Sequence, residues 1–165
     1  MHLDGQFSVS AAQADVYAFL TDPATVSRHM PDVKDVVVED ADHFTVTARV
    51  GVSHIKGAMV MKLEIRDRQP PTSTTVIGKG TGLGSVVDIV TGFTLSAGPP
   101  LDENGLAAEP ALRTTVKWQA DVTISGTLAA FGPQGLLDRI ARKNIDTFIA
   151  GIRSGLSASG RSGVI

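Results

Sequence analysis

At 165 residues, the chain has the size of one ordinary domain and is long enough to bury a hydrophobic core. A net charge of -2 gives no overall field for nucleic acid, and the absence of cysteine excludes disulfides, thiolate metal sites and cysteine nucleophiles. Residues 1–9 do not resemble a signal peptide, and no run of about 18 apolar residues occurs. We therefore expect a cytoplasmic protein that contacts a membrane only peripherally, at the inner face.

The N-terminal part predicts one strand and two short helices. Alternating apolar residues indicate a strand over Leu3–Val9. Ser10 and Gln13 fit a capping box, in which each side chain satisfies a backbone N–H of the other, so we predict a helix over about 11–20. Asp22-Pro23 predicts the start of a second short helix, with aspartate as the cap and proline in the first turn.

The middle of the chain has the period-two alternation of antiparallel strands. The pattern indicates strands over 33–39, 44–52, 59–65, 74–79 and 85–95. One side of each strand is apolar and the other polar, which is typical of a sheet with one face in solvent. A long surface loop, rich in proline and glycine, is expected over about 97–110.

The last part predicts a strand followed by one long amphipathic helix. Residues 112–124 alternate, with Val116, Trp118 and Ala120 among the apolar positions. A helix is predicted from Pro133 to about Leu156, because apolar residues recur every three or four positions. The order β, α, α, six strands, α predicts an α+β fold in which a curved antiparallel sheet wraps around the C-terminal helix. We expect a single domain over 1–156 and a flexible tail over 157–165.

One helix over a wide curved sheet leaves space that it cannot fill alone. Large side chains are scarce, since the chain has six Phe, one Tyr and one Trp. We therefore predict an apolar cavity for a ligand, although the same residues would also suit a packed core. The expected lining residues are Phe44, Val46, Met59, Met61, Leu63, Ile89, Phe93, Val116, Trp118, Ala120, Leu137, Ile140, Ala141, Ile145, Phe148 and Ile152.

The other side of the long helix is basic, with Arg139, Arg142, Lys143 and Arg153. Solvated charge is the commoner meaning of such a face, and contact with anionic headgroups or a partner is the alternative.

Other polar features give weaker signals. Residues Gly78–Gly84 are spaced as G-x-G-x-G-x-G, which favours a hairpin turn over a phosphate loop. The four histidines have no metal-like spacing, and we expect them to face solvent, with no metal site. Asp88 could be a polar group in the cavity, but the strand alternation favours an outward position.

Several segments resemble the carbon monoxide dehydrogenase G-subunit family. The resemblance lies in Gly5 to Pro23, Ile55 to Ile65, Gly78-Lys79-Gly80, Gly126 to Gly132 and Leu137 to Lys143 with Phe148, and covers about residues 3–152. That family belongs to the START-like, polyketide-cyclase-like helix-grip superfamily, also called SRPBCC. The resemblance implies a helix-grip fold and an accessory protein of a molybdenum-containing CO dehydrogenase or related hydroxylase, with no catalytic residues to transfer.

These considerations lead to a hypothesis of a non-catalytic binding protein. It would take a quinone, menaquinone or ubiquinone, or a similar lipid from the membrane and present it to the partner dehydrogenase. No other cofactor is expected. Two alternatives stay open: a small cyclase or hydrolase of the same fold, which needs polar residues inside the cavity, and a docking scaffold with a packed interior and no ligand.

Overall fold

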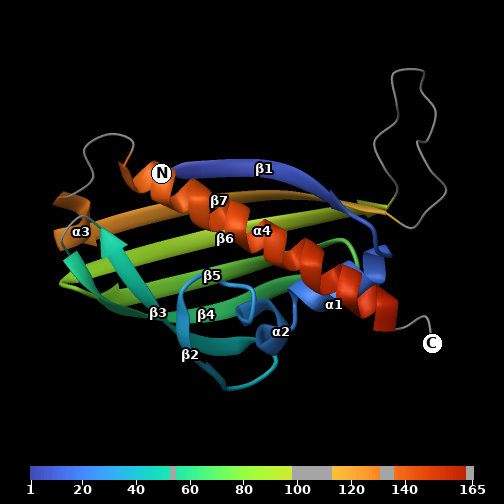
Figure 1. Ribbon diagram of the computed structural model, residues 1–165, viewed down its shortest axis with the longest axis horizontal. Helices are drawn as coiled ribbons and strands as arrows, with labels where there is room; N and C mark the ends of the chain where they lie inside the picture. The colour runs from blue at the N-terminus through green and yellow to red at the C-terminus, as the bar shows by residue number, and fades with distance from the viewer. Residues whose placement is uncertain (53–54, 98–112, 131–135, 163–165) are drawn as a thin grey trace.

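The computed structural model describes residues 1–52, 55–97, 113–130 and 136–162. One curved sheet and one long helix dominate the molecule, and the helix crosses a face of the sheet diagonally (Figure 1). The elements in chain order are β1 (His2–Val9), α1 (Gln13–Leu20), α2 (Pro23–Ser27), β2 (Val33–Val38), β3 (His43–Val52), β4 (Ile55–Gln69), β5 (Ser73–Gly82), β6 (Ser85–Ala97), β7 (Thr114–Gly126), α3 (Thr127–Ala130) and α4 (Leu136–Ser162).

The sheet has seven strands in the order β1-β7-β6-β5-β4-β3-β2, and all neighbours are antiparallel. The first strand pairs with the last, so β1 and β2 form the two edges although they are consecutive strands. The helices α1 and α2 connect one edge to the other. The predicted α+β helix-grip architecture is therefore confirmed, while the loop predicted over about 97–110 falls almost entirely outside the described residues.

The starts of the two short helices show one prediction confirmed and one wrong. The side chain of Asp22 accepts a hydrogen bond from the backbone N–H of Ala24 at 3.3 Å and caps α2 as predicted. The N-cap of α1, in contrast, is Ala12, which makes no side-chain cap bond. Gln13 does not complete a capping box, because its amide donates to the carbonyl oxygens of Pro71 at 2.9 Å and Leu95 at 3.3 Å. Contacts with the sheet thus replace the local motif.

Helix α4 packs against the concave face through its C-terminal half. Ile152 is fully buried, and Leu156 is 5% exposed, in a cluster that includes Phe7 and Val116. The helix continues to Ser162, so the predicted end near Leu156 is too early. Its predicted start at Pro133 lies outside the described residues.

The glycine run has two different roles. Gly82 and Gly84 have φ of 148° and 67° at the turn between β5 and β6, which confirms a hairpin there. Gly78 and Gly80 lie within strand β5 instead, so the turn interpretation is wrong for them. A Cβ on Gly78 would stand 2.7 Å from Cδ2 of Leu63, which means that side chains of β4 lie across β5 at this point.

Candidate functional site

An apolar cavity of about 390 Å³ lies between α4 and the inner face of the sheet. Its walls come from all seven strands of the sheet, from α1 and α2, and from the middle of α4. A volume in this range is typical of small-molecule sites. The lining residues are Phe7, Leu20, Val26, Met30, Pro31, Asp32, Val33, Phe44, Val46, Ala48, Arg49, Val50, Met61, Leu63, Ile65, Val76, Ile89, Thr91, Phe93, Trp118, Ala120, Asn144, Ile145, Phe148, Ile149 and Ile152.

Most of the side chains expected at the cavity are brought together there. Those that line it are Phe44, Val46, Met61, Leu63, Ile89, Phe93, Trp118, Ala120, Ile145, Phe148 and Ile152. That they bind a ligand stays a prediction.

The remaining expected residues lie elsewhere. Met59 is buried against Leu128 of α3, in a cluster that also includes Ile140. Val116 is fully buried in the main core, and Ala141 is half-buried outside the lining. The side chain of Leu137 lies outside the described part of the chain.

The sequence analysis missed the segment between α2 and β2. Met30 and Pro31 of this segment line the cavity together with Val26 of α2 and Val33 at the start of β2. A short segment with an X-Pro step has no periodic pattern that assigns it to a face. The signal that could have found it is the cluster of apolar residues beside a capped short helix.

Three exposed residues indicate where the cavity opens. Asp32, Arg49 and Asn144 belong to the lining and are exposed, whereas the other lining residues are buried or half-buried. The backbone N–H of Arg49 donates to the carbonyl oxygen of Asp32 at 2.8 Å, which joins the α2–β2 segment to β3. The mouth therefore lies between this segment, β3 and α4.

Two polar groups belong to the interior part of the lining, Thr91 and Trp118. The indole Nε1 of Trp118 is buried and makes no hydrogen bond within the described residues. Leaving such a donor without an acceptor costs about 1–3 kcal/mol. The only ionisable lining residues in the described ranges, Asp32 and Arg49, are at the mouth. The interior is thus uncharged and, apart from these two groups, apolar.

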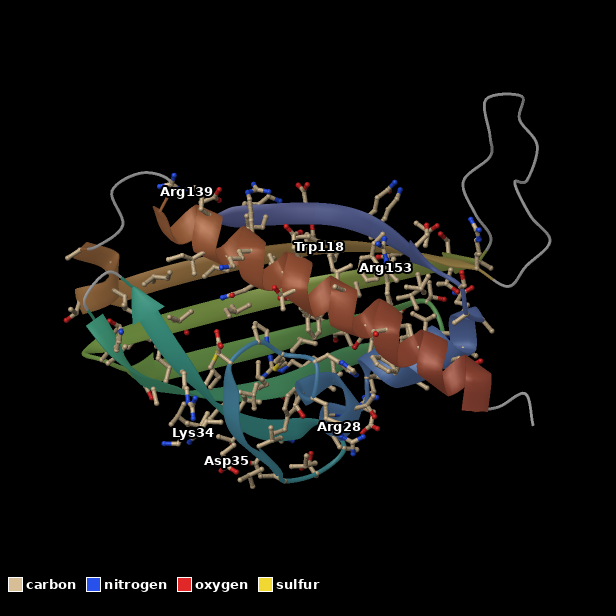
Figure 2. The ribbon with its side chains drawn as sticks, in the orientation of Figure 1. Arg28, Lys34, Asp35, Trp118, Arg139 and Arg153 are labelled. Carbon is tan, nitrogen blue, oxygen red and sulfur yellow. The ribbon has the colours of Figure 1, made fainter. Side chains whose placement is uncertain are left out.

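The basic residues of α4 are exposed, as expected for either interpretation. Figure 2 shows Arg139 near the beginning of the helix and Arg153 further along it. The Nε of Arg142 contacts Oδ2 of Asp138 at 3.0 Å, and the guanidinium of Arg153 lies 5.9 Å from the ring centroid of Phe7. Arg142 and Arg153 are therefore engaged within the protein itself.

The histidines differ in their surroundings. Exposed His2 contacts Asp121 at 2.8 Å, and exposed His43 contacts Asp40 at 2.9 Å; these hydrogen bonds raise the pKa of both imidazoles above 6.5. His29 is half-buried against Phe19, so the expectation that it faces solvent is wrong. His54 lies outside the described residues. No cluster of three possible metal ligands occurs in the described part of the chain.

The opposite face of the sheet is polar. Asp88 is exposed there, opposite Lys79, which confirms the favoured outward position. A shallow depression of about 640 Å³ crosses this face from β1 to β4, with Gln6, Lys117 and Gln119 among its lining. Its polar surface suits water better than an apolar ligand, so the cavity beneath α4 is the better candidate site.

Comparisons with known proteins agree with this geometry. A family model described as the G subunit of carbon monoxide dehydrogenase (CoxG) matches residues 5–157. No protein with a curated description matches the sequence. In the described ranges, no helix combines the length and the apolar character that crossing a bilayer requires.

Several solved structures share the fold. A conserved protein from Geobacillus kaustophilus has a TM-score of 0.80 at 19% identity, covering 96% of this chain and 97% of that one. A START superfamily protein from Mycobacterium smegmatis has a TM-score of 0.69 at 8% identity, covering 95% and 97%. The Zhui aromatase/cyclase from Streptomyces sp. R1128 has a TM-score of 0.66 at 13% identity, covering 99% and 98%. At these identities, the likeness shows the fold alone.

Proposed function

The chain belongs to the carbon monoxide dehydrogenase G-subunit (CoxG) family, and on this premise we propose that it is a carrier for a quinone or a similar apolar lipid. It takes menaquinone, ubiquinone or a comparable molecule from the membrane and presents it to a molybdenum-containing CO dehydrogenase or related hydroxylase. The observation that supports this proposal is the apolar cavity of about 390 Å³ beneath α4. Burial of an apolar tail there is favoured by roughly 25 cal/mol per Å² of surface removed from water.

We propose a binding role rather than an enzymatic one, although the fold is shared with the Zhui aromatase/cyclase. General acid–base catalysis requires a titratable side chain within hydrogen-bond reach of the reacting atoms. Within the described lining, the ionisable side chains are Asp32 and Arg49, both exposed at the mouth. Tyr17 is buried nearby in the core, but its hydroxyl donates to the carbonyl oxygen of Ser73 at 3.0 Å and is not part of the lining. The interior therefore offers no evident acid or base.

Native mass spectrometry of the purified protein, before and after organic extraction, tests the carrier function. The protein is expected to hold a lipid or to take up added menaquinone or ubiquinone. A matched pair of variants on β3 localises the binding. Ala48→Phe adds a large side chain to the cavity wall, whereas Thr47→Phe adds it to the opposite face of the same strand. Uptake should fall in Ala48→Phe and persist in Thr47→Phe, with both variants folded by circular dichroism. A wild-type protein that binds none of these molecules contradicts the proposal.

We further propose that the basic side of α4 meets the membrane or the partner enzyme. Each cation near an anionic bilayer contributes about 1 kcal/mol. Lys143→Glu should weaken binding to phosphatidylglycerol vesicles in a sedimentation assay. Lys117→Glu makes the same charge change on the outer face of β7 and is the control. Equal losses in both variants would indicate a non-specific effect of net charge and would contradict this surface.

A further inference from the structure

Three polar side chains surround the mouth of the cavity, and none of them has a partner in the described part of the protein. Asp32, Arg49 and Asn144 belong to the lining and are exposed. None of the three side chains makes a hydrogen bond or an ion pair with another described residue. The backbone N–H of Arg49 bonds to the carbonyl oxygen of Asp32, so these residues are neighbours, yet their opposite charges form no ion pair. The guanidinium, the carboxylate and the amide are therefore available to a ligand.

The interior of the cavity suits a polar head group poorly. The indole N–H of Trp118 is buried against Gly5 of β1 and is not accessible from the cavity. The hydroxyl of Thr91 is then the one available polar side-chain group in the interior part of the described lining. A head group with two oxygen atoms would leave at least one of them unpaired among apolar side chains, which is unfavourable. The polar end of a ligand is therefore better placed at the mouth.

The mouth lies far from the other end of the lining. Arg49 is on β3 and Ala120 is on β7, with β4, β5 and β6 between them. Figure 1 shows β2 and β3 toward one edge of the sheet and β1 at the other. Neighbouring strands lie about 4.8 Å apart, so roughly 19 Å separate the two ends. An experiment that locates the head group can therefore distinguish them clearly.

The volume of the cavity indicates how much of a tail the interior accepts. A methylene group occupies nearly as much space as a water molecule, about 30 Å³. The cavity of about 390 Å³ therefore holds roughly ten carbon atoms of an apolar chain. A ten-carbon tail is thus the appropriate length for a probe.

The groups at the mouth suit an uncharged head that carries oxygen atoms. A guanidinium only donates hydrogen bonds, a carboxylate only accepts them, and an amide does both. The two carbonyl oxygens of a quinone accept hydrogen bonds, so they fit Arg49 and Asn144. The two hydroxyl groups of its reduced form also donate, so they fit Asp32 as well. An anionic head is less favoured, because the carboxylate of Asp32 opposes the attraction of Arg49.

We propose that Arg49, Asn144 and Asp32 form the head-group subsite of the carrier, which binds both a quinone and its hydroquinone while the apolar tail fills the interior. This inference rests on the proposed carrier function and adds the orientation of the ligand and the two oxidation states that it takes. Two electrons from the partner dehydrogenase and two protons from water convert both carbonyl groups of the quinone to hydroxyl groups. Because Asp32 accepts from a hydroxyl, the protein also returns the hydroquinone to the membrane.

The orientation is tested with decylubiquinone, whose ring carries two methoxy groups and whose tail has ten carbon atoms. Nuclear Overhauser effects in NMR spectra of the complex report which protein protons lie near each end of the probe. We expect effects between the methoxy protons and the side chains of Arg49 and Asn144, and between the terminal methyl group and Phe93 or Ala120. The reverse pattern, with the methoxy protons near Phe93 or Ala120, would overturn the proposal.

Variants at the mouth provide an independent measurement, by calorimetric titration with decylubiquinone and, under argon, with decylubiquinol. Arg49→Met removes a donor and should weaken binding of the quinone by roughly threefold to tenfold, the effect of one hydrogen bond. Asn144→Ala should weaken binding of both forms. Lys117→Met removes the same charge on the outer face of β7 and is the control, with unchanged affinities expected.

Asp32 is tested by a variant that keeps the backbone conformation. Its φ is 57°, which glycine adopts freely, so Asp32→Gly removes the carboxylate without straining the chain. We expect this variant to lose affinity for decylubiquinol and to keep its affinity for decylubiquinone. Dodecanoate, which has a carboxylate head and a tail of similar length, should bind the wild-type protein more weakly than either form. Tighter binding of dodecanoate would contradict the choice of an uncharged head.

The outcomes separate this inference from the carrier function. If the wild-type protein binds decylubiquinone but Arg49→Met and Asn144→Ala bind it equally well, the subsite is wrong and the carrier function stands. If the wild-type protein binds neither the probes nor any lipid, the carrier function itself fails. The NMR experiment on the wild-type protein decides the orientation even where a variant does not fold.

Discussion

The imidazole of His29 stacks on the ring of Phe19, with ring centroids 5.3 Å apart and an angle of 26° between the planes. The stacked pair packs against α4 at Gly151 and Gly155, which lie four residues apart on one side of the helix. His29 directly precedes Met30 and Pro31, two residues of the cavity lining. The contact therefore fixes the segment at the mouth of the cavity to the helix that covers it.

Gly155→Ala should loosen this contact. Alanine favours an exposed helix by about 1 kcal/mol over glycine. Here the added Cβ would stand 2.8 Å from both Nε2 of His29 and Cζ of Phe19, so the rings must move. Overpacking of this kind costs about 1–3 kcal/mol, and we expect a net loss of about 1 kcal/mol in the free energy of unfolding, measured by urea denaturation.

The exposed neighbour Ser154 provides the control for this helix. Ser154→Ala should stabilise the protein slightly, because alanine has the higher helix propensity and nothing is displaced. Stabilisation of Gly155→Ala to a similar extent would show that the stacked rings do not constrain α4.

The glycines of β5 make a second prediction possible. Gly78→Ala places a Cβ 2.7 Å from Cδ2 of Leu63, whose side chain must then turn toward the cavity. We expect weaker uptake of menaquinone and a loss of about 1 kcal/mol or more in stability. Gly51→Ala is the matched control, since a Cβ there meets nothing within 4 Å. A Gly78→Ala protein with unchanged uptake would show that Leu63 does not limit the available space.

The cap of α2 supports the segment at the mouth. Asp22→Ala removes the acceptor for the N–H of Ala24 and should cost about 1 kcal/mol, measured as a lower midpoint of thermal unfolding. Asp22→Asn keeps an equally good cap and should retain most of the stability. Equal destabilisation in both variants would point to the charge of Asp22 rather than to its hydrogen bond.

His2 links stability to pH at the β1–β7 pair. Its pKa is raised above 6.5, mainly by the hydrogen bond to Asp121 and further by Asp4. A group with a raised pKa in the folded state stabilises it fully below pH 6.5, and this stabilisation is lost as pH rises through the folded-state pKa. Asp121→Asn should therefore lower the pKa of His2 in an NMR titration and weaken this part of the pH dependence. His43, which contacts Asp40 instead, should keep its raised pKa and is the internal control.

Much of the fold could be predicted because strand alternation is a strong local signal. The β3 and β4 residues expected to face inward, such as Phe44 and Leu63, are buried. The capping box was wrong because Gln13 could also reach carbonyl oxygens of Pro71 and Leu95, residues distant in sequence. Local motifs cannot show such competition. The end of α4 at Ser162 was also missed, since a glycine- and serine-rich segment has a low helix propensity by itself.

The candidate site could be predicted only in part. Which inward residue lines the cavity and which fills the core depends on neighbours far along the chain. Met59 is covered by Leu128 of α3. This helix has only four residues, which is too short for a periodic pattern to predict it. The lone donor of Trp118 depends on Gly5 in β1, more than a hundred residues away in the sequence. Such relationships come from the register of β1 with β7.

The order of the strands affects the range of ligand sizes that the cavity can accept. Within the described residues, β1 and β2 each have a single neighbour, so the sheet does not close upon itself. A closed barrel has a circumference fixed by its strand number and shear. An open sheet can become less curved without losing hydrogen bonds between its strands. The width of the cavity can therefore adjust to the size of the ligand.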